Sequence, residues 1–111
     1  MSDNTLSTVD ANNFKLVKIA GEVDLSWSQK VRKAILDALA ASRQVAVDLS
    51  AVSYIDSSGI AALVEGFQQA RGKGQRFALI AVSPAVMAVL ELARLDRVFP
   101  LFASLEDAAK A

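Results

Sequence analysis

The chain has 111 residues, a length that predicts one domain spanning residues 1–111. Hydrophobic residues make up 53% of it and charged residues 22%, so it can bury enough apolar surface to fold alone. Twelve basic and twelve acidic side chains give a formal net charge of zero, which argues against nucleic-acid binding driven by phosphate neutralisation. Cysteine and histidine are both absent, which excludes disulfides and thiolate nucleophiles and removes the commonest general base and metal ligand.

The apolar stretches and the amino terminus together indicate a cytoplasmic protein. The longest strongly apolar stretch, residues 81–90, is far too short to cross a bilayer and is interrupted by Pro84. Residues 1–10 have neither the basic start nor the apolar centre of a signal peptide, so we expect none.

The first third of the chain predicts two strands followed by a helix. Residues 1–12 are mostly polar and are expected to form a short edge strand or to fray. Residues 14–20 alternate in part between apolar and polar side chains, which is typical of a strand, and residues 21–24 follow as a loop. Ser26 or Ser28 is then expected to cap a helix whose apolar positions recur at helical spacing.

The middle of the chain predicts the centre of a sheet and a second helix. Residues 45–49 form a compact apolar run interrupted only by Asp48, a pattern typical of a strand buried on both faces. Residues 54–59 then lead into apolar positions at helical spacing from Ile60 onward. Two glycines between residues 72 and 74 mark the end of this helix.

The last part of the chain predicts two further strands and two further helices. Residues 75–82 form a strand, after which Ser83 caps a helix with Pro84 in its first position. Residues 97–102 form a short strand whose proline suits an edge or a strand end. Ser104 begins a C-terminal helix through a variant of the capping box.

This order of elements places the chain in the α/β class. Helices alternate with strands after the second strand, which requires right-handed crossovers and a largely parallel sheet flanked by helices. We therefore expect a central sheet of about five strands, with an antiparallel edge strand, and about four helices.

The run Asp56-Ser57-Ser58-Gly59, directly before an apolar helix, is the most unusual turn in the chain. Sites in open α/β sheets gather at the carboxyl ends of strands, and a helix start presents unpaired N–H groups and positive partial charge. A catalytic serine is disfavoured because no histidine can activate it, and a P-loop is disfavoured because its glycine and lysine pattern is absent. Two interpretations remain on residue types alone: a plain helix cap, which is the commoner case, and a regulated hydroxyl.

Phosphorylation of a serine in this turn would change its surface strongly. A phosphate adds about −1.5 to −2 charge and three acceptor oxygens, which a helix N-terminus tolerates within the protein. If Asp24 and Asp56 share the surface with Ser57, the modified face is strongly anionic and repels a partner that fits the unmodified face. A binding surface with such a serine works as a switch.

Four motifs of the chain resemble, in order and approximate spacing, those of the STAS domain family. They are Gly-Glu-Val-Asp at 21–24, Val-Ala-Val-Asp-Leu-Ser at 45–50, Val-Ser-Tyr-Ile-Asp-Ser-Ser-Gly at 52–59 and Ser-Pro-Ala-Val at 83–86. The specific part is the Asp-Ser-Ser-Gly that follows a buried strand. The resemblance extends from about residue 14 to about residue 110 and is to the stand-alone anti-sigma factor antagonists of the family.

This resemblance implies a functional cycle. In that family the unmodified antagonist binds an anti-sigma factor that is also a serine protein kinase, and so frees the sigma factor for transcription. The resemblance implies that this kinase phosphorylates Ser57, that the phosphorylated chain releases its partner, and that a metal-dependent protein phosphatase resets the cycle. ATP and the metal belong to those partners, so it implies no cofactor, no metal and no enzymatic activity for this chain.

The resemblance also implies which residues form the partner surface. Asp56, Ser58 and Gly59 shape the loop around the phosphorylated serine. Asp24 lies on the neighbouring loop, which such a kinase contacts, and Ile60 at the start of the helix is a weaker contact.

Other uses of the family stay open. A STAS domain also serves as the small subunit of an ABC transporter that moves lipids, where it supports the ATPase without phosphorylation, or as a component of a stress-signalling assembly. The two hydroxyls of Ser57 and Ser58 favour the switch. A receiver domain phosphorylated on Asp48 is disfavoured because the carboxylates that would hold magnesium are only loosely present. Trp27 is expected to be either a partner anchor or a buried end of the core.

Overall fold

The computed structural model describes residues 4–111, so residues 1–3 of the predicted edge strand lie outside the described residues. Five strands and four helices are present in this range. They are β1 (Thr5–Ala11), β2 (Phe14–Val23), α1 (Leu25–Ala41), β3 (Gln44–Ile55), α2 (Ser57–Gly72), β4 (Arg76–Ile80), α3 (Pro84–Leu92), β5 (Leu101–Phe102) and α4 (Leu105–Lys110). Within residues 4–111, no helix has the length and apolar character needed to cross a membrane.

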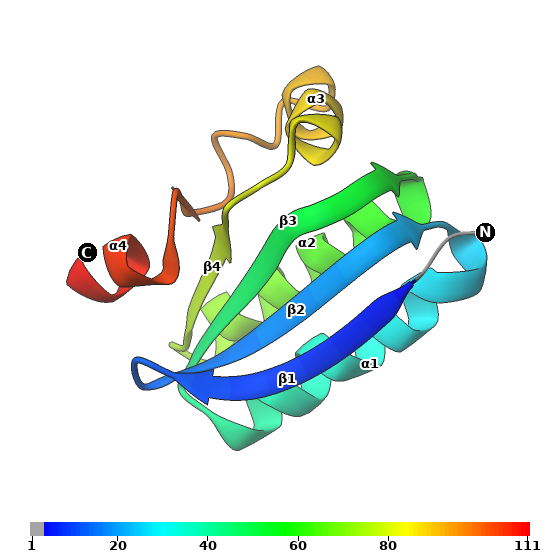
Figure 1. Ribbon diagram of the computed structural model, residues 1–111. Helices are drawn as coiled ribbons and strands as arrows, with labels where there is room; N and C mark the ends of the chain where they lie inside the picture. The colour runs from blue at the N-terminus through cyan, green and yellow to red at the C-terminus, as the bar shows by residue number, and fades with distance from the viewer. Residues whose placement is uncertain (1–3) are drawn as a thin grey trace.

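The strands form one sheet in the order β1-β2-β3-β4-β5 (Figure 1). β1 is antiparallel to β2, and every other neighbouring pair is parallel. The predicted α/β class, with a mostly parallel sheet, an antiparallel edge strand and four helices, is confirmed. Because β2, β3 and β4 run in the same direction, the turns that lead into α1, α2 and α3 all begin at the carboxyl end of the sheet.

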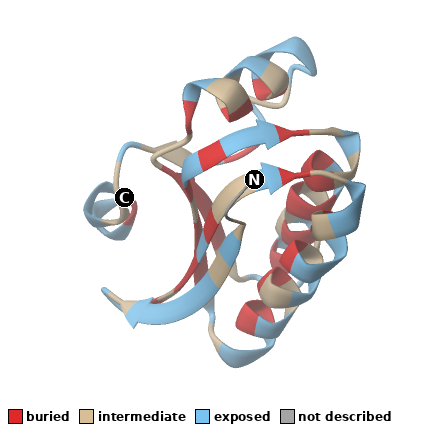
Figure 2. Ribbon diagram, turned by 45° about the vertical axis from the view of Figure 1, so that its right-hand side comes forward, coloured by how far each residue is buried: buried red, intermediate tan, exposed pale blue. Residues whose placement is uncertain are grey.

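The main core lies between the sheet and helices α1 and α2, which pack side by side on one face (Figures 1 and 2). Its fully buried side chains come from these two helices, from α3 and from the central strands; the largest are Ile35, Leu49, Leu63, Leu79 and Leu90. A smaller cluster lies on the opposite face, where Ala108 of α4 packs against Phe14, Leu16 and Ile80. The sheet is therefore covered on both faces near its centre, as parallel sheets require.

Strand β3 is the centre of the fold and is longer than its sequence pattern predicts. Val45, Val47 and Leu49 are fully buried, which confirms the predicted central strand. The strand continues to Ile55, however, because β2 runs beside it over the whole distance. Beyond the last pairing of β3 with β4, the hydroxyl of Ser83 donates to the carbonyl oxygen of Val52 at 2.7 Å, and α3 covers this part of the strand.

Residues 21–24 were expected to form a loop, and this expectation is wrong for residues 21–23, which belong to β2. Gly21 has a φ of 98°, and the strand accommodates it through a shift in its register with β3. The side chain of Asn4 then pairs with the backbone of Glu22, donating to its carbonyl oxygen at 2.9 Å and accepting from its N–H at 2.8 Å. A Cβ at position 21 would overlap the Asn4 side chain, so the bulge and this contact depend on glycine.

Of the three helix caps predicted from the sequence, two are confirmed. Ser83 caps α3 with Pro84 in the first turn, and Ser104 caps α4 by accepting from the N–H of Asp107 at 3.1 Å. The prediction for α1 is wrong: neither Ser26 nor Ser28 is its cap, because Asp24 occupies that position.

The last predicted strand, residues 97–102, is shortened to the two residues of β5. The N–H groups of Val98 and Phe99 both donate to the carbonyl oxygen of Leu95, at 3.0 and 3.3 Å. These bonds close a turn, so the chain joins the sheet only after Pro100.

Candidate functional site

Two helix N-termini lie next to each other at the carboxyl end of the sheet. Val23 and Ile55 are partners in the last pairing of β2 and β3, and the N–H of Asp56 donates to the carbonyl oxygen of Val23 at 3.1 Å. Each strand is followed at once by an aspartate, Asp24 or Asp56, and then by a helix. The structure therefore brings the two predicted acidic positions together on one rim of the molecule.

Asp56 is the cap of α2. Its Oδ1 atom accepts from the N–H groups of Ser58 and Gly59, at 2.9 and 3.2 Å, and from the Ser58 hydroxyl at 2.6 Å. These bonds hold the pKa of Asp56 below its ordinary value, chiefly through the Ser58 hydroxyl. The backbone of Leu25 in the neighbouring turn also contributes to this lowered pKa. Asp56 is therefore an anchored carboxylate that stays ionised near neutral pH.

Ser57 occupies the first position of α2 and is exposed. Its hydroxyl enters none of the hydrogen bonds that form the cap, which use Asp56, Ser58 and Gly59. Ser58, by contrast, is partly buried and its hydroxyl is committed to Asp56. Of the two adjacent serines, Ser57 alone offers a hydroxyl that an approaching enzyme can reach without breaking the cap.

Asp24 repeats the same geometry at the start of α1. It accepts from the N–H of Ser26 at 3.0 Å and from the Ser26 hydroxyl at 2.6 Å. Its backbone angles, φ −105° and ψ −172°, match those of Asp56, φ −106° and ψ −173°. The position that corresponds to Ser57 is Leu25, so only one of the two caps carries a free hydroxyl.

Gly59 and Ile60 lie beneath this rim and belong to the packing of α2 on the sheet. A Cβ at Gly59 would come within 2.6 Å of Ile55 and 2.8 Å of Val23, so the helix approaches the strand ends closely here. Ile60 is only 8% exposed and is part of the main core. A direct contact between Ile60 and a partner stays a prediction, and its burial leaves little surface for one.

Two exposed hydrophobic residues accompany the caps and were not predicted as site residues. Leu25, the first residue of α1, is 71% exposed, and Tyr54, two residues before Asp56, is 49% exposed. One feature of the sequence could have indicated the exposure of each residue. Leu25 directly follows the cap residue of α1, and Tyr54 follows Ser53 in the polar part of β3. Exposed apolar groups on a rim of carboxylates and hydroxyls are typical of a protein-binding surface.

Trp27 is partly buried and packs against the main core. The ammonium group of Lys30 lies 4.7 Å from the centroid of its ring. The indole Nε1 atom is buried and has no hydrogen-bond partner within residues 4–111. The structure therefore favours the second of the two expected roles, an end of the core.

Two further polar residues considered from the sequence, Asp48 within β3 and Ser83 before α3, serve the fold. Asp48 accepts from the N–H of Ser50 at 2.9 Å, which agrees with the expected local role. Ser83 is 7% exposed and bridges α3 to Val52, so its hydroxyl is not part of the surface around Ser57.

The mostly parallel sheet, the Asp-Ser-Ser-Gly turn at the start of α2 and the neighbouring acidic cap define a STAS domain. The family model of the STAS domain matches residues 5–108, and the chain belongs to this family. The anti-sigma-F factor antagonist RsfB of Mycobacterium tuberculosis is 30% identical over 105 residues, which cover 94% of this chain and 85% of that protein.

Solved structures agree with this assignment. The crystal structure of an anti-sigma factor antagonist from Mycobacterium paratuberculosis matches with a TM-score of 0.87 and 29% identity, over 97% of this chain and 92% of that one. The Bacillus cell fate determinant SpoIIAA in its phosphorylated form matches with a TM-score of 0.71 and 20% identity, over 96% of each chain. At 20% identity, this second match shows a similar fold only.

Proposed function

We propose that this chain is an anti-sigma factor antagonist whose binding is switched by phosphorylation of Ser57. The observation that carries the proposal is the exposed hydroxyl at the start of α2, which lies outside the cap that Asp56 forms. The mycobacterial relatives support the antagonist part, because both are named anti-sigma factor antagonists and align with more than nine-tenths of this chain, 94% and 97%. The phosphorylated Bacillus protein supports the compatibility of this fold with a phosphate.

The unmodified chain binds an anti-sigma factor through the rim at the carboxyl ends of β2 and β3. Leu25 and Tyr54 supply exposed apolar area, and Asp24 and Asp56 supply carboxylates for hydrogen bonds and charge complementarity. Binding at this rim occupies the anti-sigma factor and so keeps it from its sigma factor.

Phosphorylation is carried out by the anti-sigma factor acting as a serine kinase. The γ-phosphoryl group of ATP is transferred to Ser57 Oγ, whose proton passes to a base on the kinase, and ADP leaves. This chain is then a substrate and not an enzyme, and ATP and its metal stay with the kinase. A protein phosphatase hydrolyses the phosphoserine and restores the hydroxyl.

The phosphate weakens binding through charge. It adds about −1.5 to −2 charge beside the ionised carboxylate of Asp56. The N–H groups of Ser58 and Gly59 already donate to Asp56, so the cap leaves these donors unavailable to the phosphate. The added charge therefore faces the partner, and a surface that fits the unmodified rim is repelled.

The proposal is tested by phosphorylating the purified chain with ATP and each anti-sigma factor kinase of its host, and mapping the product by mass spectrometry. The expected product carries a single phosphate, on Ser57. Incorporation at another residue, or no incorporation with any of these kinases, contradicts the switch.

A further inference from the structure

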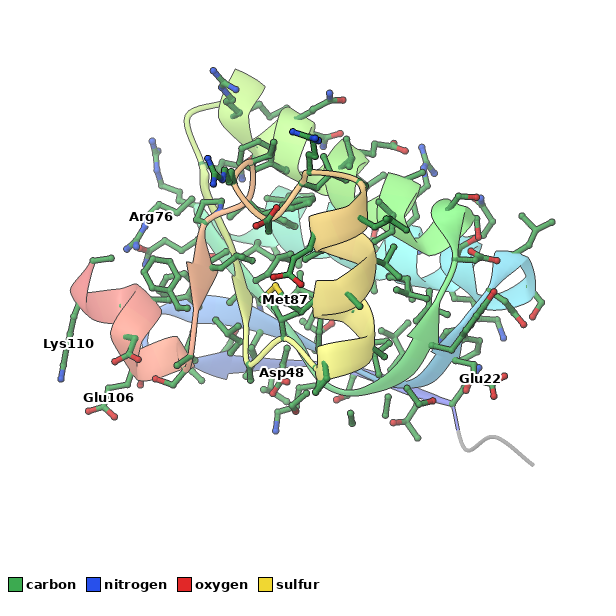
Figure 3. The ribbon with its side chains drawn as sticks, turned by 90° about the horizontal axis from the view of Figure 1, so that it is seen from above. Glu22, Asp48, Arg76, Met87, Glu106 and Lys110 are labelled. Atoms are coloured by element: carbon green, nitrogen blue, oxygen red, sulfur yellow. The ribbon has the colours of Figure 1, made fainter. Side chains whose placement is uncertain are left out.

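A cavity of about 270 Å³ lies at the end of the molecule opposite the rim that carries Ser57, which is formed at the carboxyl ends of β2 and β3. It is found between the last turn of α2, the start of β4 and the short strand β5. Figure 3 shows Arg76, which lines it, at the far end of the molecule from Glu22, which belongs to the last part of β2. The cavity is therefore separate from the surface assigned to the partner.

The walls of the cavity are largely apolar and include three aromatic rings. Phe67, Phe77, Pro100 and Phe102 line it. The rings of Phe67 and Phe77 have centroids 6.3 Å apart, and Phe67 also contacts the ring of Phe99, with centroids 5.4 Å apart. An apolar cavity of about 150 Å³ accepts benzene, so this larger one has room for a ring with a short chain.

The backbone of Phe77 adds an unused hydrogen-bond donor to this wall. Successive N–H groups of a strand point in alternating directions. The N–H of Arg76 donates toward β3, to the carbonyl oxygen of Arg43 at 2.9 Å. The N–H of Leu79 donates to the opposite side, to the carbonyl oxygen of Pro100 at 3.0 Å. Phe77 faces the same side as Leu79, but β5 pairs with β4 only from Leu79 onward, so within residues 4–111 no strand partner faces the N–H of Phe77. Because Phe77 is 5% exposed, an acceptor at this point is favoured.

The charged side chains that line the cavity are both positive. Arg71 and Arg76 line it, and no acidic residue does so within the described part of the chain. Arg76 is held in place, because its guanidinium donates to Gln44 Oε1 at 3.2 Å and to the carbonyl oxygen of Ala108 at 2.7 Å. Arg71 is exposed and takes part in none of the ion pairs formed within residues 4–111.

We propose that this cavity binds a small apolar carboxylate. The apolar body lies among the aromatic rings, where its size and character fit the space. The carboxylate accepts from the N–H of Phe77 and pairs with the guanidinium of Arg71, the exposed cation that lines the cavity. Charge complementarity with Arg71 selects an acid over a neutral molecule of the same shape.

The test titrates 3-phenylpropionate into the ¹⁵N-labelled full chain and follows the amide resonances. We expect saturable shifts at Phe77 and its neighbour Ala78, with a Kd of about 1 mM for a ligand of this size. The Arg71→Gln variant is expected to bind about tenfold more weakly, because a charge-assisted hydrogen bond is lost. Lys73→Gln is the matched control: it removes the same charge two residues away, outside the cavity lining, and is expected to leave the Kd unchanged. The neutral probe 3-phenylpropanol is expected to bind about tenfold more weakly than the acid.

Three results would overturn the proposal. They are the absence of saturable shifts, saturable shifts confined to residues away from the cavity, and equal weakening by Arg71→Gln and Lys73→Gln, which would show a general charge effect. None of these measurements involves Ser57 or an anti-sigma factor, so the outcome is independent of the proposed switch.

Discussion

The two adjacent serines at the start of α2 have the same chemistry but different surroundings. The hydroxyl of Ser58 donates to Asp56 at 2.6 Å and belongs to the cap. The hydroxyl of Ser57 is exposed and takes no part in it. The choice between them as a phosphate acceptor therefore depends on which hydroxyl is free.

Replacing each serine by alanine separates these roles. Ser57→Ala is expected to abolish phosphate incorporation by the kinase and to leave partner binding intact, because the cap is unchanged. Ser58→Ala is the matched control: it keeps the acceptor and loses about 1 kcal/mol of stability with its cap hydrogen bond. Mass spectrometry after incubation with ATP and kinase, together with urea unfolding, measures both effects. Full phosphorylation of Ser57→Ala would place the acceptor elsewhere.

The lowered pKa of Asp56 predicts a pH-dependent contribution to stability. Because the folded pKa lies below the unfolded one, about 3.9, the contribution is complete above that value and is lost as the pH falls through the folded pKa. Asn at position 56 still caps the helix but does not titrate. The free energy of unfolding of Asp56→Asn is therefore expected to lie below that of the parent at about pH 6 and to approach it at about pH 3. A difference that grows in acid would contradict the assigned direction.

At the residue scale, the sequence was enough to find the turn that begins α2, whereas the choice of Ser57 as the phosphate acceptor follows from the resemblance to the family and stays a prediction. It was not enough to place the cap of α1, because Ser26, Ser28 and Asp24 are all good capping residues. The choice depends on where β2 ends, which is set by its pairing with β3 and not by local sequence. The exposure of Leu25 and Tyr54 is also a property of packing and could not be predicted from their types.

The start of α2 lies unusually close to the strands beneath it. Gly59 is the third residue of the helix and faces Ile55 and Val23 with no room for a side chain. The distance between the cap and the sheet therefore depends on this glycine.

Gly59→Ala tests this close packing. The added Cβ would lie 2.6 Å from Ile55 and 2.8 Å from Val23, so we expect a loss of about 1–3 kcal/mol in the free energy of unfolding. Gly72→Ala is the matched control in the same helix, because a Cβ there meets nothing within 4 Å. Alanine is the better helix former, so this control is expected to gain up to about 1 kcal/mol. If both variants are equally stable in urea unfolding, α2 does not depend on close packing at Gly59.

At the element scale, the number, type and order of helices and strands followed from the sequence, whereas several boundaries did not. Apolar runs and caps define the centres of elements such as β3. The ends of β2 and β3 extend into polar residues because two parallel strands support each other there. β5 is shortened because Val98 and Phe99 form a turn on Leu95, a contact that no pattern in the sequence indicates.

For the whole molecule, the proposed switch changes the charge of a surface and does not act through unfolding. A negative charge at a helix N-terminus is tolerated and contributes about 0.3–1 kcal/mol of stabilisation. Ser57 lies outside the core, so an added group there displaces no packed side chain.

Ser57→Asp, which partly imitates the phosphate, is therefore expected to keep the melting temperature within a few degrees, about 5 °C, of the parent. It is expected to bind the anti-sigma factor at least about tenfold more weakly. Calorimetry and binding measured on the same preparation check this pair of results. Weak binding together with a large fall in melting temperature would indicate unfolding as the cause.

The most direct measurement is the affinity of the anti-sigma factor for the chain before and after stoichiometric phosphorylation, determined by isothermal titration with the site mapped by mass spectrometry. The account predicts tight binding of the unmodified chain and a loss of at least about a hundredfold when Ser57 alone carries phosphate. Equal affinity of the two forms would contradict it.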